Sequence, residues 1–327
     1  MTATKFVATG IVIHVDTVEL GKTGLQISVA GLGCGGASRL GQRLGASTEE
    51  SIQIVREALD LGITYFDTAQ AYGTEEIVGH ALKGHRDEVV ISTKANIVRT
   101  DSRSEQAKSI RSAVEASLVK LQTETIDVFH LHGIADDDYD YCVSEVLPEL
   151  LSLRDQGVIR YIAISELFGK DSTHEMLQRA KFDDFWDVFM VGFNLLNPSA
   201  RLTVLPETMS NNIGVEVMFA VRRAISRPEV LRKMIVDASA EGLLDASALD
   251  LEDPLGFLVH NAGASSVVEA AYRFARHEPG CDVVLTGTGN REHLRENVRS
   301  INLPTLPETD LERLRSLFGQ LTIFTGN

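Results

Sequence analysis

Three side chains that can exchange protons follow two short strand-like segments. Asp67 and Tyr72 come after the strand formers Tyr65 and Phe66, and Lys94 follows the apolar stretch 89–93. If both strands are parallel neighbours in one sheet, their C-terminal ends bring the three side chains together. A tyrosine, with an ordinary pKa of about 10, exchanges protons near neutral pH only when a cation stabilises its phenolate. The set indicates proton transfer, although a structural Asp67–Lys94 ion pair covered by Tyr72 accounts for the same residues.

A fourth candidate lies on the following strand, 126–132. The two-residue period of a strand puts His130 and His132 on one face, with His132 at the C-terminal end. Such a pair can ligate a metal, but a metal site needs further ligands at neighbouring strand ends, where Ser165 and Phe193 stand instead. We therefore expect no metal, and we interpret His132 as a neutral hydrogen-bond donor to a substrate oxygen above His130 in the core.

The segments that position these residues alternate between strand and helix. The strands are nearly continuous apolar runs, as expected when both faces of a parallel strand are buried. Eight strand–helix units predict an α/β fold, a closed (β/α)8 TIM barrel, whose chemistry lies at the C-terminal strand ends. A doubly wound sheet is the alternative, but the glycines after the first strand lack the GxGxxG spacing of a dinucleotide site. The expected strands are 27–33, 65–67, 89–93, 126–132, 159–165, 188–193, 214–220 and 282–287.

The chain is expected to form one domain over residues 1–327. Residues 1–26 contain turn signals and predict a short N-terminal hairpin or irregular lead-in. Ser47 and Glu50 have capping-box spacing and predict the start of a helix. Residues 222–265 form a long loop insertion after the seventh strand, with one helix at 228–240, which is a candidate lid. The other expected helices are 74–84, 104–121, 141–156, 173–180 and 202–210.

Composition and charge exclude some classes of partner. The formal charge of −15 argues against nucleic acid and anionic membranes, which need a basic protein surface. The three cysteines are far apart and indicate neither disulfides nor a thiolate metal site. No signal peptide or membrane span is visible, so we expect a cytoplasmic protein. An acidic run in the loop after strand four is a solvated face or selects cationic or polyhydroxylated substrates: Asp136, Asp137, Asp138 and Asp140.

The sequence resembles the aldo-keto reductase superfamily over about residues 18 to 300. Asp67, Tyr72, Lys94 and His132 fall, in order, where that family carries its catalytic tetrad. The surrounding sequence is also similar in the stretches 65–73, 92–94, 126–132, 157–165, 286–290 and 294–297. The resemblance implies an NAD(P)-dependent oxidoreductase that moves a hydride between the nicotinamide and a carbonyl or alcohol. Tyr72 would be the general acid and base, Lys94 held by Asp67 would lower the phenol pKa, and His132 would orient the carbonyl.

The resemblance also implies a set of cofactor contacts, with some departures from the family pattern. Glu166 follows Ser165 where asparagine is common, and Met190 replaces a glutamine. Met218, with Phe219 beside it, replaces the tyrosine that stacks on the nicotinamide, and His293 replaces an arginine at the 2′-phosphate. Arg222 and Arg223 could reach the pyrophosphate or be solvated. The implied contacts are Gly33, Cys34, Ser165, Glu166, Met190, Met218, Phe219, Arg222, Gly287, Thr288, Asn290, His293, Glu296 and Asn297.

These departures leave NADP(H) as the family's usual cofactor but make NAD(H) or dual use credible. The implied substrate is a small carbonyl compound or a sugar, and the sequence is closer to the sugar-dehydrogenase-like branch, such as L-galactose or aldose dehydrogenases, than to aldose reductases. The alternative function is a cofactor-binding regulatory or redox-sensing subunit that resembles potassium-channel β subunits. A homo-oligomer is compatible with either function.

Overall fold

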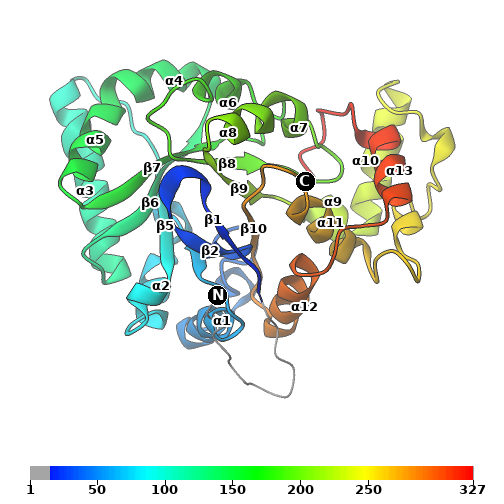
Figure 1. Cartoon of the computed structure of the whole chain (residues 1–327), viewed down its shortest axis with the longest axis horizontal. Coiled ribbons are helices and arrows are strands. Elements are labelled where there is room, and N and C mark those ends of the chain that lie inside the picture. The colour runs from blue at the N-terminus through cyan, green and yellow to red at the C-terminus, as the bar shows by residue number, and fades with distance from the viewer. Residues whose placement is uncertain (1–14, 327) are drawn as a thin grey trace.

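A computed structural model of the chain shows a closed barrel of eight parallel strands in the order β10-β3-β4-β5-β6-β7-β8-β9 (Figure 1). The structure describes residues 15–326, so the expectation for residues 1–14 lies outside the described residues. The predicted TIM barrel is confirmed. The strands are β3 (Ala30–Gly33), β4 (Tyr65–Asp67), β5 (Val90–Ala95), β6 (Ile126–Ile134), β7 (Ile159–Glu166), β8 (Val188–Gly192), β9 (Gly214–Met218) and β10 (Val283–Thr286).

The register of neighbouring strands brings polar residues to one end of the barrel. Asp67 on β4 pairs with Ser92 on β5, and Lys94 on β5 pairs with His130 on β6. Because all of these strands are parallel, the residues that follow them share the same rim.

A two-stranded antiparallel hairpin, β1 (Thr17–Glu19) and β2 (Gln26–Ser28), precedes the barrel. Its buried Leu20, Leu25 and Ile27 pack against residues at the N-terminal strand ends, including Tyr65 and Val90. The hairpin therefore closes the N-terminal end of the barrel, which we call the barrel floor (Figure 1). The prediction of one strand over 27–33 was wrong, because its first residues belong to the hairpin and only Ala30–Gly33 enters the barrel.

Helices surround the barrel, and α1 begins with the predicted capping box. The Ser47 side chain accepts from the backbone N–H of Glu50, and the Glu50 carboxylate accepts from the N–H of Ser47. Among the described residues, no helix is long and apolar enough to cross a membrane. The helices outside the segment after β9 are α1 (Thr48–Asp60), α2 (Glu75–Ala81), α3 (Arg103–Leu121), α4 (Asp136–Tyr141), α5 (Leu147–Asp155), α6 (Glu175–Ala180), α7 (Ala200–Thr203), α8 (Leu205–Ser210), α11 (Val267–Arg276), α12 (Arg291–Ile301) and α13 (Glu308–Phe318).

The acidic run after β6 is a helix and not a loop, which corrects the sequence prediction. Asp136, Asp137 and Asp138 occupy the first turn of α4, where the helix dipole favours negative charge. Arg99, which follows β5, forms an ion pair with Asp138, and Arg179 of α6 forms one with Asp136. A π-helical turn, Cys142–Val146, joins α4 to α5, so the helix predicted over 141–156 is present but begins earlier, at Asp136, and contains a π-helical turn.

The long segment after β9 contains two helices, α9 (Arg223–Ser226) and α10 (Pro228–Ala240), followed by short 3-10 turns. Figure 1 draws α10 and α13 at the same side of the barrel. The guanidinium of Arg313 on α13 lies 4.2 Å from the ring centroid of Phe257, which belongs to this segment. The chain end then returns to α9, where the N–H of Ala224 donates to the carbonyl of Gly326.

Gly79 is a residue at which α2 comes close to the backbone at the end of α3. A Cβ at this position would lie 2.5 Å from the carbonyl oxygen of Lys120, which is backbone and cannot move aside. Gly79→Ala would normally favour a helix, but we expect it to destabilise this protein by about 1–3 kcal/mol, as overpacking does. Chemical denaturation measures the change. Gly169→Ala is the control, because no atom of the described chain, apart from its sequence neighbours, lies within 4 Å of its Cβ position. Equal stability of the two variants would contradict the prediction.

Candidate active site

A cavity of about 2300 Å³ opens at the C-terminal ends of the barrel strands. Asp67, Tyr72 and His132 line its floor, together with Met190 from β8 and Met218 from β9. Its walls come from the β3–α1 loop, the segment after β9 and the turn between β10 and α12. This is the rim at which TIM-barrel proteins carry their chemistry.

Lys94 and Asp67 form a fully buried ion pair beneath the cavity. The Lys94 ammonium donates to Asp67 Oδ1 and to the carbonyl of Thr68, the latter over 2.9 Å. Ser92 supports the carboxylate by donating to the same Asp67 oxygen at 3.0 Å. Neither side chain is more than 4% exposed, so each charge depends on the other for its compensation.

Tyr72 stands above this pair on a 3-10 turn, Gln70–Tyr72, which ends at Gly73 with a φ of 73°. Its hydroxyl lies 3.5 Å from Nε2 of His132, and the two rings meet edge to face with centroids 5.5 Å apart. Nζ of Lys94 lies 5.2 Å from the centre of the Tyr72 ring. Gly35 supports the back of the ring, since a Cβ there would come within 2.5 Å of Tyr72. The four sequence-predicted side chains are therefore brought together at one point.

Burial and charge define the protonation of these groups. Burial and the charge of Lys94 lower the pKa of His132 to about 3, so its imidazole is neutral at physiological pH. Burial raises the pKa of Tyr72, and the ammonium of Lys94 opposes that effect only in part. Burial disfavours the charged Lys94, but Asp67, Tyr72 and Glu216 together outweigh it and raise the pKa of Lys94. The cavity floor thus presents a protonated phenol beside a neutral imidazole, above a protonated lysine.

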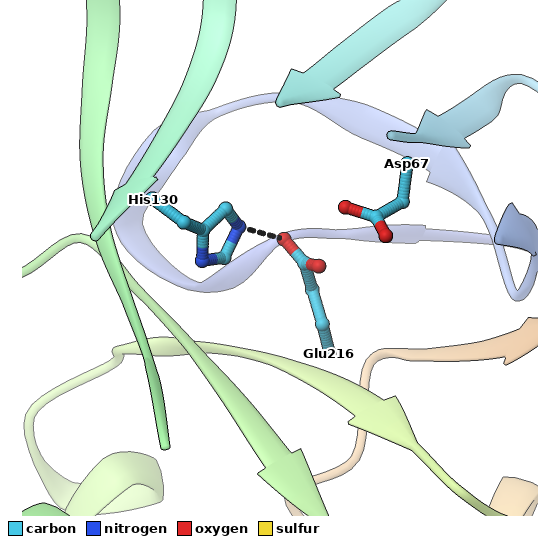
Figure 2. Close-up of side chains that lie close together, drawn as sticks. All are labelled: Asp67, His130 and Glu216. Carbon is cyan, nitrogen blue, oxygen red and sulfur yellow. Dashed lines mark hydrogen bonds and ion pairs between the residues drawn. The ribbon is translucent and has the colours of Figure 1, made fainter. Parts of the chain in front are cut away.

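A second carboxylate lies inside the barrel next to Asp67, as Figure 2 shows. Glu216 on β9 is fully buried, accepts from Tyr65 Oη and lies 3.0 Å from Nε2 of His130. One polar atom each from Asp67, His130 and Glu216 lies within 4.8 Å of the others. His130, which we predicted to be a simple core residue, is in fact paired with a buried acid. Sequence reasoning missed Glu216, although an acid inside the apolar strand 214–218 was a visible signal.

Most of the predicted cofactor contacts line the cavity, whereas three do not. The side chains of Cys34, Ser165 and Glu166 are buried, and none of the three residues belongs to the cavity lining. Residues that line the cavity and were not predicted include Gly35, Arg43 and Leu44 from the β3–α1 loop and Val259 to Asn261 from the segment after β9. The predicted contacts that do line it are Gly33, Met190, Met218, Phe219, Arg222, Gly287, Thr288, Asn290, His293, Glu296 and Asn297.

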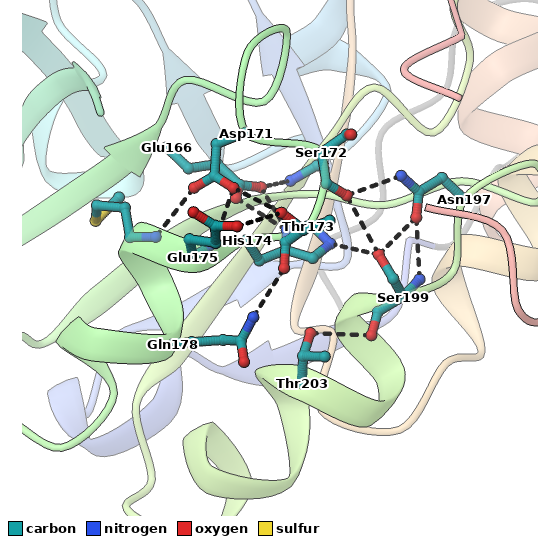
Figure 3. A network of polar contacts seen from close by, with 12 residues as sticks. Glu166, Asp171, Ser172, Thr173, His174, Glu175, Gln178, Asn197, Ser199 and Thr203 are labelled. Carbon is teal, nitrogen blue, oxygen red and sulfur yellow. Dashed lines mark hydrogen bonds and ion pairs between the residues drawn. The ribbon is translucent and has the colours of Figure 1, made fainter. Parts of the chain in front are cut away.

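Glu166 instead anchors a buried polar network behind the cavity wall (Figure 3). Its carboxylate accepts from the N–H of Gly192 at 2.6 Å and lies 2.9 Å from Nδ1 of His174. Nε2 of His174 lies 2.9 Å from the hydroxyl of Ser199, which donates to Asn197. These bonds occupy both oxygens of the Glu166 carboxylate within the protein.

Arg222 enters the cavity without a carboxylate partner among residues 15–326. Its guanidinium lies 3.8 Å from the centroid of the Phe219 ring and donates to the carbonyl of Thr325 at 3.0 Å. Burial lowers the pKa of Arg222 to about 10, so the group is still cationic at neutral pH but poorly solvated. Phe219 holds a φ of 67°, an uncommon backbone conformation for a bulky residue that is concentrated at functional sites. The poorly solvated guanidinium of Arg222 is therefore a group that an anion can neutralise.

Comparison with known proteins places the chain among one group of enzymes. The model of the aldo/keto reductase family matches residues 32–318. The uncharacterized oxidoreductase YqkF of Bacillus subtilis is 29% identical over 309 residues, which cover 91% of this chain and 95% of that protein. The L-galactose dehydrogenase of Arabidopsis thaliana is 32% identical over 208 residues, which cover 62% of this chain and 64% of the dehydrogenase.

Solved structures show the same fold. A putative aldo-keto reductase from Pseudomonas aeruginosa is 27% identical, with a TM-score of 0.64 over 87% of this chain and 93% of that one. An aldo-keto reductase from Klebsiella pneumoniae in complex with NADPH is 22% identical, with a TM-score of 0.67 over 94% of this chain and 97% of that one.

The Tyr65–Glu216 contact is testable through stability. Tyr65→Phe removes the hydroxyl that donates to a buried carboxylate whose other oxygen, Oε2, already has no partner among the described residues. We expect a loss of about 1–3 kcal/mol in the free energy of unfolding, measured with urea. In a double-mutant cycle, adding Tyr65→Phe to Glu216→Leu should cost much less than adding it to the wild type. A single variant as stable as the wild type would show that the hydrogen bond contributes nothing.

Proposed function

The chain belongs to the aldo/keto reductase family, and we propose that it is an NAD(P)(H)-dependent oxidoreductase that uses Tyr72 to exchange a proton with its substrate. The observation that carries the proposal is the position of the Tyr72 hydroxyl, 3.5 Å from Nε2 of His132 at the floor of a large cavity and directly above Lys94 and Asp67. A phenol, a neutral imidazole and a buried cation so arranged suit the protonation of a carbonyl oxygen.

The cavity fits a nicotinamide cofactor, which would supply or accept the hydride. In a protein of net charge −15, five arginines in the cavity lining have no carboxylate partner among residues 15–326: Arg43, Arg222, Arg223, Arg227 and Arg299. Such groups suit the phosphates of a dinucleotide. Met190, Met218 and Phe219, which line the same cavity, offer apolar surface for a nicotinamide ring.

The side chains of this protein have separate tasks in the proposed reaction. In reduction, Tyr72 gives its hydroxyl proton to the substrate oxygen as the carbon receives the hydride, and Lys94 stabilises the phenolate that results. Asp67 holds Lys94 in place and preserves its charge. His132, neutral and with its proton on Nε2, donates a hydrogen bond that orients the same oxygen. Oxidation of an alcohol runs these steps in reverse, with the phenolate as the base.

The substrate class follows from the family and from one relative. We propose a small aldehyde, ketone or sugar, because the matched Arabidopsis protein is an L-galactose dehydrogenase by name and the family is one of aldo/keto reductases. The cofactor is proposed to be NADP(H) in preference to NAD(H), as in the Klebsiella complex with NADPH. Ser38 also lines the cavity and offers a hydroxyl to a hydroxylated substrate.

A regulatory subunit is the second candidate, favoured by one observation: Glu166 is committed to His174 and Gly192, so one expected contact with the nicotinamide is lost. The two functions differ in turnover. The near-ultraviolet absorbance of reduced nicotinamide, followed with a panel of aldehydes, ketones, aldoses and alcohols and with both cofactors, separates them. Repeated turnover supports the oxidoreductase, whereas bound cofactor that reacts once at most with every compound supports the regulatory subunit.

Tyr72→Phe tests the proton transfer. The phenylalanine keeps the ring that packs against Gly35 and His132 but has no proton to give, so we expect turnover to fall by at least about 100-fold. Cofactor affinity, measured by fluorescence titration, should stay near that of the wild type. Retained turnover would remove Tyr72 from the reaction, and lost cofactor binding would show that the variant changed the cavity instead.

The pH profile tests the protonation states. Because the pKa of Tyr72 is raised, the phenol stays protonated through neutral pH, so reduction should be level there and decrease only in the alkaline range. Oxidation needs the phenolate and should therefore increase with pH over that range. The pKa of His132, lowered to about 3, predicts no step near neutrality from this residue. A neutral step in the reduction profile that His132→Gln removes would contradict this assignment.

A further inference from the structure

The turn between β10 and α12 has fewer donors for a phosphate than its position suggests. Asn290 caps α12 by accepting from the N–H groups of Glu292 at 2.8 Å and His293 at 3.2 Å. Two of the free amides that a helix start normally offers an anion are therefore already bonded. The negative charge of a phosphate bound at this end of the cavity must therefore be compensated mostly by side chains.

The two arginines at the start of α12 are also committed elsewhere. Arg291 and Arg295 both form ion pairs with Glu57 of α1, the latter with Nε 2.5 Å from Oε1. The Glu57 side chain is only 7% exposed, so withdrawing either arginine would leave a buried carboxylate with less compensation. His293, which lines the cavity between them, is the position where the family often has an arginine.

Arg43 reaches the same end of the cavity from a different element, the β3–α1 loop. It lines the cavity together with Gly289, Asn290 and His293. Its side chain is exposed, and it has no ion pair or hydrogen-bond partner in the part of the chain that the structure describes. The guanidinium is therefore available to a ligand.

Contact between two glycines holds this loop over the turn. A Cβ on Gly289 would lie 2.3 Å from Cα of Gly41, so the two backbones touch as only glycines allow. Gly41 adopts a φ of 90°, and its N–H and carbonyl are bonded within the loop, to Ser38 and to Ala46 and Leu44. The loop that carries Arg43 is thus an ordered part of the cavity wall beside the start of α12.

We propose that Arg43 is the residue that recognises the 2′-phosphate of NADP(H) and so determines the choice between NADP(H) and NAD(H). This inference rests on the proposed oxidoreductase function and names a specificity determinant for it. A guanidinium offers a planar pair of donors that matches phosphate oxygens, and NAD(H) has a hydroxyl in place of that phosphate. The task that the family often gives to an arginine at the position of His293 would then be performed from across the cavity.

Arg43→Gln tests the proposal through binding, without reliance on turnover. Titrations with NADPH, NADH, adenosine 2′,5′-bisphosphate and 5′-AMP, followed calorimetrically, give the dissociation constants. We expect the variant to bind NADPH and the bisphosphate roughly tenfold or more weakly, as for the loss of a charged hydrogen bond, while its affinities for NADH and 5′-AMP stay unchanged. Arg43→Glu should reverse the preference for NADPH over NADH. Arg43→Lys should bind NADPH with an affinity between those of Arg43→Gln and the wild type.

Arg222→Gln is the matched control, because Arg222 lines the cavity beyond β9 and is expected to act on the part common to both cofactors. This variant should weaken the binding of NADPH and the binding of NADH by the same factor. The inference is overturned if Arg43→Gln weakens the binding of both cofactors equally, or of neither. It is also overturned if the wild type does not bind NADPH more tightly than NADH. The proposed oxidoreductase function survives each of these results. A wild type that binds neither cofactor overturns the proposed function and this inference together.

Discussion

The buried ion pair between Lys94 and Asp67 is the constraint on which the rest of the site depends. A protonated lysine that is wholly excluded from water is tolerated only where its charge and its donors have partners. The partners come from backbone geometry: β4 and β5 are adjacent, Ser92 stands in register with Asp67, and the Thr68 carbonyl is free where the chain leaves β4. The 3-10 turn that follows β4 then holds Tyr72 over the Lys94 ammonium and against Gly35.

The barrel interior is arranged in layers that isolate this pair. The apolar side chains of the β1–β2 hairpin close the floor, and the polar layer of Tyr65, His130 and Glu216 lies between that floor and the cavity. Glu216 adds a second carboxylate beside Asp67 and contributes to keeping Lys94 protonated. Two carboxylates so close require nearby positive charge or a shared proton, and His130 and Lys94 are the groups in reach. The electrostatics below Tyr72 therefore involve three strands beyond the one that carries Asp67.

The sequence was informative where one residue's location follows from its own strand. Asp67, Lys94 and His132 were placed correctly because strand ends in a parallel barrel meet at one rim, and the alternation of apolar strands and helices gave the barrel itself. It failed where the outcome depends on residues far away in the chain. The pairing of His130 with Glu216 spans 86 residues, and the hydrogen bond from the N–H of Gly192 to Glu166 spans 26 residues, so neither contact could be inferred from a single strand. The division of 27–33 between hairpin and barrel depended on which partner strand each half found, which local pattern does not contain.

The same distinction applies to charge. A net charge of −15 describes the whole molecule, yet the cavity lining is rich in arginines that no carboxylate neutralises in the described chain. What matters for an anionic ligand is which arginines have been taken by acids of the protein. Glu57 takes Arg291 and Arg295 at the start of α12, Glu278 takes Arg201 and Glu269 takes Arg273, and each of these acids is largely buried. A buried acid holds its arginine firmly, because release would leave a desolvated charge behind. The arginines left over lie on the β3–α1 loop, after β9 and on α12, and they are the cationic side chains of the cavity lining that remain available to the phosphates of a ligand.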